Sequence, residues 1–325
     1  MSAWEVGSTV LLWSIVMAAT GIAGAEAPKP RPRAEVEAVL AKAPKPPAEG
    51  ELKPLHIVLL ADVKDHGPGQ HDYPCWQKRW APLLGGKDAA QPGVQQVNLH
   101  GMPRGDFATV AAGAPKVKIT TAWKWPSDEQ LATADLIAMY CYRSGGPNRT
   151  WSDRQVEQLA AFLNRGGGFV AIHPATYSLR DLSKPENAQA LALTRLGYDR
   201  TIRWRHGHIA MTIANRDHPI CLGLPDAIHV HDEPYWPPVG DQSTVTVLAT
   251  SDESKAKGST ERAPMPLFWT ARHGKGRIFA CVLGHFNWTF DDPYIRILLL
   301  RGMAWAAGGS PYRFDPLVLR GAAVE

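Results

Sequence analysis

Cysteine is scarce in this sequence, and its spacing excludes several common kinds of site. The chain has four cysteines in 325 residues, and no two of them form a CxxC pair. Zinc modules and thioredoxin-like redox motifs depend on such closely spaced pairs. Cys141 and Cys281 lie within or at the end of apolar runs, so we expect buried free thiols rather than a disulfide framework.

Clustered basic charge and a long apolar segment are also missing. Lys and Arg total 35 against 31 for Asp and Glu, and the basic residues are scattered along the chain. We therefore expect no nucleic acid as a partner. The apolar run at 10–19 is shorter than a membrane-spanning helix requires. The GK[ST] ending of a P-loop is absent after the first strand-like run.

Residues 1–25 are typical of a signal peptide or an N-terminal anchor. Small residues follow the apolar run, and 23–25 offer an A-x-A cleavage site. We expect an exported protein, periplasmic or extracellular, with a membrane-anchored protein as the alternative if this segment stays uncleaved. Residues 26–54 are rich in Pro, Ala and Lys, which predicts a solvated linker with a short helix near 34–42. Residues 311–325 are expected to form a C-terminal tail.

Strand-like and helix-like segments alternate between residues 55 and 310. Several apolar runs are unbroken, as in parallel strands covered on both faces. The segment 152–165 has Ser152 and Gln155 in capping positions, an apolar stripe, and Gly166 after its end, which predicts a helix. This alternation predicts one α/β domain with a doubly wound, mainly parallel sheet. The predicted strands are 55–61, 94–99, 134–141, 168–173, 208–214, 244–250 and 277–283.

Histidines come soon after three of the predicted strands. His66 follows the first strand, His173 ends the run GFVAIH, and His285 follows RIFACVLG. Because ligands bind outside the carboxyl ends of parallel strands, these side chains are expected to converge on one edge of the sheet. A hydrogen-bonded loop histidine is the ordinary alternative for each of them taken alone.

The loop DHGPGQHDYP (65–74) and the segment HDEPYW (231–236) add titratable groups. Glycines and a proline shape the first segment, which we interpret as a wall of the site; a loop that only caps the sheet is the alternative. In the second, Asp232 and Glu233 are adjacent, and adjacent residues of a strand point to opposite faces. We therefore expect only one of the pair, Glu233, to face the site.

Several of these motifs together resemble the ThuA-like (trehalose-utilisation) family. The resemblance covers residues 55–309 and is carried by GGGFVAIHPATY (166–177), WRHGHIAMTI (204–213), DHPICLGLP (217–225), HDEPYW and the closing segment 266–309. It implies the class I glutamine-amidotransferase-like, flavodoxin-like fold. Amidotransferases of this fold carry a nucleophilic cysteine in the turn that here reads AIHPA. Because His173 stands at that place, glutamine hydrolysis is not expected.

The resemblance implies a sugar or an oxidised keto-sugar as substrate, and two kinds of chemistry remain open. One is a divalent metal site, Zn²⁺ or Mn²⁺, held by His173, His208, His285 and Glu233. The other is metal-free acid–base catalysis by a set of four side chains. The acid–base set is His173, His285, Glu233 and His66, and the expected substrate-binding residues are His71, Asp72, Tyr73, Arg143, Tyr177, Trp236, Asn287 and Trp288.

The competing class is a non-catalytic sugar-binding or accessory protein on the same fold. It would use the same pocket without turnover, and its affinity would depend on the aromatic residues. In either class the expected partner is a small carbohydrate, and assembly into a homo-oligomer is an open alternative. A hydrolase, lyase or isomerase acting on a glycoside or keto-sugar would be the corresponding enzyme.

Overall fold

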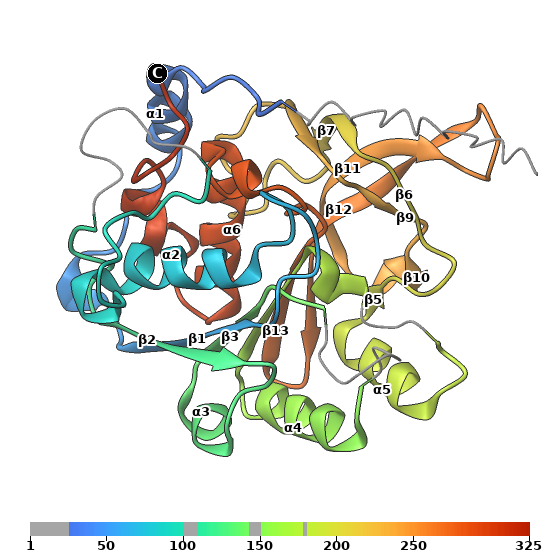
Figure 1. Ribbon diagram of the computed structural model, residues 1–325, viewed down its shortest axis with the longest axis horizontal. Helices are drawn as coiled ribbons and strands as arrows, with labels where there is room; N and C mark the ends of the chain where they lie inside the picture. The colour runs from blue at the N-terminus through green and yellow to red at the C-terminus, as the bar shows by residue number, and fades with distance from the viewer. Residues whose placement is uncertain (1–25, 101–109, 143–150, 178–180) are drawn as a thin grey trace, which may run out of the picture.

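A nine-stranded mixed sheet runs through the computed structural model, which describes residues 26–100, 110–142, 151–177 and 181–325 (Figure 1). The strand order is β2-β1-β3-β4-β13-β12-β11-β7-β8. The expected α/β class is confirmed. The strands are β1 (Leu55–Ala61), β2 (Val117–Trp123), β3 (Leu136–Met139), β4 (Gly168–Ile172), β7 (Gly207–Ile213), β8 (Ala227–Asp232), β11 (Thr246–Ser254), β12 (Arg262–His273) and β13 (Gly276–Cys281).

The two halves of the sheet differ in strand direction. From β2 through β1, β3 and β4 to β13 all neighbours pair in parallel. From β13 through β12, β11 and β7 to β8 they pair antiparallel. The unbroken apolar runs of β1, β3 and β4 are buried at every residue, as expected for strands with helices on both faces. The parallel arrangement is thus limited to the first half.

One predicted strand is wrong, and the sheet contains three strands that were not predicted: β2, β8 and β12. Residues 94–99 form no strand of the sheet; Val94 and Val97 are buried at a spacing of three, which anchors an irregular segment. The edge strand is β2, whose residues are mostly exposed or half-buried. Because hydrophobic patterning detects strands by their buried residues, a polar edge strand gives little signal.

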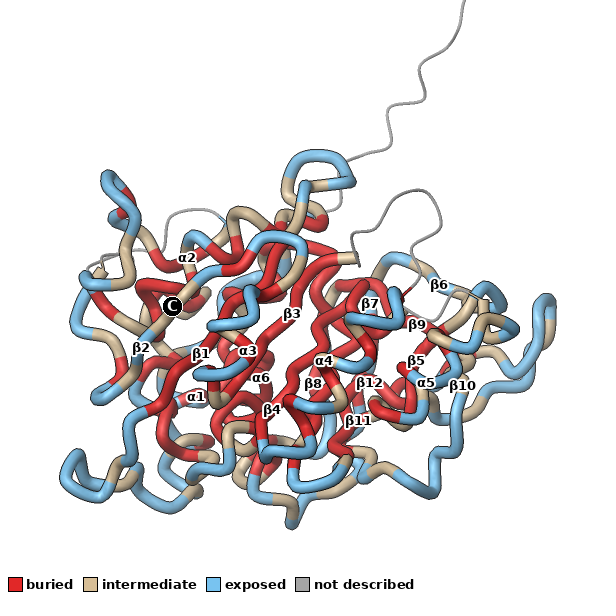
Figure 2. The backbone as a smooth tube through the Cα atoms, turned by 90° about the horizontal axis from the view of Figure 1, so that it is seen from below, coloured by how far each residue is buried: buried red, intermediate tan, exposed pale blue. Residues whose placement is uncertain are grey.

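Helices cover both faces of the parallel half (Figure 1). On one face, α2 (Tyr73–Gly85) packs against β1 and β2, and α6 (Pro293–Ala306) packs against β3, β4 and β13. The other face is covered by α3 (Asp128–Thr133), α4 (Asp153–Asn164) and α5 (Pro185–Thr194). The predicted capping box of α4 is confirmed, because Ser152 accepts from the backbone N–H of Gln155 at 3.3 Å and Gln155 accepts from that of Ser152 at 3.2 Å. The strands lie along the buried centre between these layers (Figure 2).

Two short ribbons complete the fold at the end of the antiparallel half. β5 (Leu196–Gly197) pairs with β10 (Val239–Gly240), and β6 (Arg203–Trp204) pairs antiparallel with β9 (Tyr235–Trp236). The β6–β9 register matches Trp204 with Tyr235, and the β7–β8 register matches Gly207 with Asp232. The two ladders therefore share one register, which places His206 opposite Glu233.

The segments expected to be a solvated linker and a tail pack on the domain instead. In α1 (Arg33–Ala41), Val36 and Val39 belong to the hydrophobic core, because the helix is amphipathic. Arg31 pairs with Asp292 at 2.7 Å. At the other end, the 3₁₀ segment η7 (Pro311–Leu317) buries Phe314 completely. Residues 1–25, expected to be a signal peptide or anchor, lie outside the described residues. Across residues 26–325, apart from the undescribed gaps, no helix has the length and apolar character to cross a membrane.

A buried ion pair on α6 yields a stability prediction. Arg301 is fully buried; its Nε donates to Asp315 Oδ1 at 2.9 Å and its Nη2 to Asp315 Oδ2 at 2.8 Å. Replacing Arg301 by Ala leaves a buried carboxylate without its cation, which costs about 3–5 kcal/mol of unfolding free energy. Urea unfolding of Arg301→Ala measures this loss. The control is Arg154→Ala, whose partner Asp128 is 74% exposed, and a loss below about 1 kcal/mol is expected there. Equal losses in both variants would contradict the assignment.

Candidate functional site

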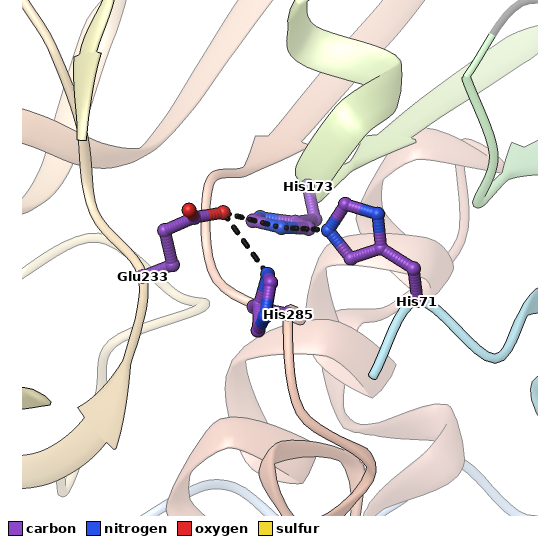
Figure 3. A group of neighbouring side chains, drawn as sticks. All are labelled: His71, His173, Glu233 and His285. Atoms are coloured by element: carbon purple, nitrogen blue, oxygen red, sulfur yellow. Dashed lines mark hydrogen bonds and ion pairs between the residues drawn. The ribbon is translucent and has the colours of Figure 1, made fainter. Parts of the chain in front are cut away.

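Three loops bring histidines to the same edge of the sheet. His173 is the first residue after β4, and His285 follows β13 through Val282, Leu283 and Gly284. β4 and β13 are parallel neighbours, with Ile172 opposite Cys281, so their carboxyl ends lie side by side. His71 arrives from the loop after β1, where its backbone N–H donates to the His285 carbonyl at 2.9 Å. The predicted convergence of strand-end histidines is confirmed (Figure 3).

The backbone at these turns is unusual and allows the close approach. His71 has φ 42 and His173 has φ 49, both in the left-handed region, which is uncommon for residues other than glycine. Gly284 has φ 132, and a Cβ at this position would lie 3.2 Å from the His173 Cβ. Backbone strain of this kind concentrates at functional sites because surrounding contacts must hold it in place.

Four side chains point into one small volume. The His71 and His173 Nε2 atoms are 2.9 Å apart, and Glu233 Oε2 lies 3.2 Å from His173 Nε2 and 3.1 Å from His285 Nδ1. All four residues are buried, and their ligand-type atoms lie within 4.8 Å of one another. We call His71, His173, Glu233 and His285 the His/Glu cluster (Figure 3).

The adjacent carboxylates take separate roles. Glu233 enters the His/Glu cluster from the segment between β8 and β9. Asp232 is fully buried and accepts from the backbone N–H groups of Gly284 at 2.8 Å and His285 at 2.9 Å. It also accepts from the Thr289 hydroxyl at 2.5 Å. Asp232 therefore fixes the turn that presents His285, while Glu233 supplies the carboxylate of the cluster.

Hydrogen-bond partners outside the cluster determine which ring nitrogens carry protons. His173 Nδ1 lies 2.6 Å from the Val282 carbonyl oxygen; a carbonyl only accepts, so Nδ1 donates, and in the neutral ring Nε2 carries the lone pair. His71 Nδ1 lies 3.0 Å from Asp65 Oδ1. A carboxylate also only accepts, so Nδ1 of His71 carries the proton. Tyr73 also donates to Asp65, at 2.9 Å. Two imidazole lone pairs and a carboxylate oxygen thus face one another.

The electrostatics of the cluster favour neutral rings beside charged carboxylates. Burial lowers the pKa of His71 to about 3 and also lowers the pKa of His285. Burial alone would raise the pKa of Glu233, but the close contacts with the rings of His173, His206 and His285 hold it well below its usual range. Burial alone would also raise the pKa of Asp65. Hydrogen bonds from His66, His71 and Tyr73 instead hold this pKa well below its usual range. A hydrogen bond to Glu233 raises the pKa of His206.

The donor set fits a divalent cation. Imidazole nitrogen and carboxylate oxygen are ligands for Zn²⁺ and Mn²⁺. Ligand atoms about 2.0–2.1 Å from such an ion lie roughly 3.0–3.4 Å from one another, close to the 2.9–3.2 Å separations of the cluster. Asp65 and the Val282 carbonyl orient His71 and His173 as second partners of metal-binding histidines do. Among the described residues, His285 Nε2 is buried without such a partner.

A cavity of about 210 Å³ adjoins the cluster at Glu233. Aromatic and polar side chains share its wall, as in sites for small organic ligands. His206 stands in it with 41% of its side chain exposed, and its Nε2 lies 3.1 Å from Glu233 Oε1. The described lining residues are His66, Tyr142, Tyr177, Ile202, Trp204, His206, Glu233 and Tyr235.

The structure separates the predicted site residues into two groups. His66 and Tyr177 line the cavity, and His71 belongs to the cluster itself rather than to its rim. Tyr73 is buried behind His71. Asn287 is buried, and its backbone N–H donates to the Gly69 carbonyl at 2.8 Å. Whether these side chains contact a substrate stays a prediction, and Arg143 lies outside the described residues.

Other predicted site residues have structural partners away from the cavity. His208 is exposed and pairs with His229 at 3.0 Å, so the expected ligand set is corrected: His71 takes the place of His208. Asp72 caps α2 by accepting from the Cys75 N–H at 3.2 Å. The Trp236 indole donates to the Ser254 carbonyl at 3.0 Å, and the Trp288 indole to the His231 carbonyl at 2.8 Å. Neither tryptophan lines the cavity.

Three polar groups of the site were not predicted. Asp65 orients His71, His206 bonds Glu233, and the Tyr235 hydroxyl lies 3.0 Å from His173 Nε2. The sequence did contain a signal for His206. Residues two positions apart in a strand lie on the same face, and His206 stands two positions before His208, which was predicted to face the site. The sequence WRHGH offers both His206 and His208, and pairing decides between them.

The lowered pKa of His71 gives a pH prediction. The unfolded chain binds a proton at this ring below about pH 6.5, whereas the folded protein stays neutral there down to about pH 3. Stability of the metal-free protein therefore falls as the pH drops through this window, by up to about 1.4 kcal/mol per pH unit from one group. Urea unfolding at several pH values should show a smaller slope for His71→Gln than for wild type. The exposed His208→Gln is the control, and an unchanged slope in His71→Gln would contradict the assignment.

Comparisons with known proteins agree with this architecture. The model of the ThuA family, described as trehalose utilisation, matches residues 85–306. A ThuA-like protein from Parabacteroides merdae is 19% identical, with a TM-score of 0.52 over 79% of this chain and 92% of that one. A ThuA-like protein from Bacteroides uniformis is 16% identical, with a TM-score of 0.51 over 82% and 98%. The comparison with curated proteins gave no match. Both structures share the fold, and because the family model spans more than half of the sequence, the chain belongs to the ThuA (trehalose utilisation) family.

Proposed function

We propose that this protein processes a sugar or keto-sugar at the His/Glu cluster with the help of a bound Zn²⁺ or Mn²⁺. Family membership supports a carbohydrate-related role. The donor set supports the metal, and the adjoining cavity supports a small organic substrate. In this proposal the reaction is proton abstraction next to a carbonyl or cleavage of a glycosidic linkage.

One observation carries the metal assignment. His71 Nε2 and His173 Nε2 both present lone pairs, and they meet at 2.9 Å with a carboxylate oxygen 3.2 Å from one of them. Neutral acceptors and a carboxylate repel one another in a buried site, where the low dielectric strengthens the repulsion. A cation at their common centre turns each repulsion into an attraction.

The proposal assigns a distinct task to each group. His71, His173 and Glu233 would hold the ion, with His285 as the fourth ligand-type group of the cluster. When bound, the ion supplies Lewis-acid polarisation of a carbonyl or glycosidic oxygen. His66 and His206 line the cavity and are half exposed, so both would reach a bound substrate as proton donors or acceptors.

Metal analysis combined with turnover tests this function. Purified wild type is expected to contain about one Zn²⁺ or Mn²⁺ per chain by elemental analysis, and His173→Ala and Glu233→Gln are expected to lose it, because each removes a ligand of the ion. Turnover is followed on trehalose, other disaccharides and their 3-keto derivatives. His285→Ala should lower the rate by about 10–100-fold, the usual cost of removing a partner of a metal site.

The control is His208→Ala, because His208 is an exposed histidine outside the cluster. It should retain both the metal and the wild-type rate. Equal rates in wild type and His285→Ala, or metal bound equally by wild type and His173→Ala, would refute the assignment. Sugar binding without turnover by any metal form would establish the non-catalytic alternative.

A further inference from the structure

We propose that the cavity beside the His/Glu cluster binds one uncharged sugar ring, with the exposed Trp204 indole as its stacking surface. The inference rests on the proposed function and names the substrate class of the same site. It adds Trp204 and His206 as residues that determine specificity.

The ribbon geometry places the relevant side chains on one face. Trp204 lies opposite Tyr235 in the β6–β9 ladder, and the shared register places His206 opposite Glu233. Alternate residues of a strand share a face, so Trp204, His206, Glu233 and Tyr235 face the same side. All four line the cavity. Glu233 and Tyr235 also contact His173, at 3.2 Å and 3.0 Å, so this face leads directly from solvent to the cluster.

Trp204 is exposed where most large apolar side chains are buried. Its exposed fraction is 58%, and the other large apolar side chains exposed among the described residues are Val63 and Trp123. Its ring is tilted against that of His206, with 5.4 Å between the ring centroids. An exposed aromatic ring at the mouth of a polar cavity offers an apolar face to a ligand, and a sugar ring has such a face between its hydroxyl groups.

The polar atoms of the cavity favour hydroxyl donors over anions. His66 Nδ1 lies 2.8 Å from Asp65 Oδ1, and His206 Nε2 lies 3.1 Å from Glu233 Oε1. Both nitrogens therefore donate to carboxylates, whose oxygens carry the negative charge at this wall and act as acceptors. The described lining residues include Glu233 and contain no Lys or Arg. A ligand rich in O–H donors and without negative charge complements this wall.

The size of the cavity limits the enclosed part of the ligand. At about 210 Å³ it is smaller than the roughly 300–1,000 Å³ of pockets that enclose drug-sized molecules. One ring fits this space, and a second sugar unit or other substituent extends past Trp204 into solvent. The cavity therefore admits glycosides by their terminal ring.

Calorimetric titration with defined sugars tests this inference. The probes are the methyl glycosides of glucose, galactose and mannose, their 3-keto derivatives, and glucose 6-phosphate as the anionic comparison. Wild type should bind at least one neutral glycoside more tightly than the phosphate. Trp204→Ala should weaken that binding by roughly tenfold, because it removes the stacking surface. Trp204→Phe keeps an aromatic face and should stay within about threefold of wild type.

The matched control is Trp123→Ala, which removes an exposed tryptophan on β2 that does not line the cavity. It should bind sugars as wild type does. Wild-type affinity in Trp204→Ala, tighter binding of the phosphate, or no binding of any probe would overturn the inference. Measurements on the same variants distinguish this inference from the proposed function. Trp204-dependent binding together with no turnover by the metal-loaded protein supports the ring site and refutes the metal chemistry. Metal-dependent turnover with a wild-type KM in Trp204→Ala supports the metal chemistry and overturns the ring site.

Discussion

The site depends on several hydrogen-bond acceptor atoms that lie close together at one buried point. The Nε2 atoms of His71 and His173 and a carboxylate oxygen of Glu233 converge among buried residues. The arrangement is costly by itself, because each group loses solvation and repels the others. The fold holds it through contacts outside the cluster, with Asp65 behind His71 and the Val282 carbonyl behind His173. In the proposed function a bound cation would offset this cost, which would link the stability of the site to its function.

The mixed sheet explains how the groups meet. The parallel half places the ends of β4 and β13 side by side, which delivers His173 and His285. The antiparallel half ends in the ribbon that delivers Glu233 and walls the cavity. Asp232 connects the two halves by bonding the turn of His285 from the end of β8. The site therefore forms only when both halves of the sheet are in place.

Parts of this arrangement could be predicted from the sequence because they follow from strand direction. Unbroken apolar runs revealed the parallel strands, and His173 and His285 stand next to their carboxyl ends. Other parts depend on pairing that the sequence leaves open. His206 and His208 are two residues apart, and only the structure shows that His208, which lies opposite His231 in the β7–β8 ladder, bonds the His229 side chain outside the site. The roles of Asp72 and Trp288 were hidden for a similar reason, because a helix cap and an indole hydrogen bond depend on backbone groups that patterning does not locate.

X-ray absorption spectroscopy at the metal edge of the metal-loaded protein reports whether the His/Glu cluster ligates an ion. We expect one ion per chain with nitrogen and oxygen neighbours at about 2.0–2.2 Å and the multiple-scattering pattern of at least two imidazole rings. The pattern should change in His71→Ala. A spectrum with only oxygen neighbours, or one that is identical in wild type and His71→Ala, would rule out a metal site at the cluster.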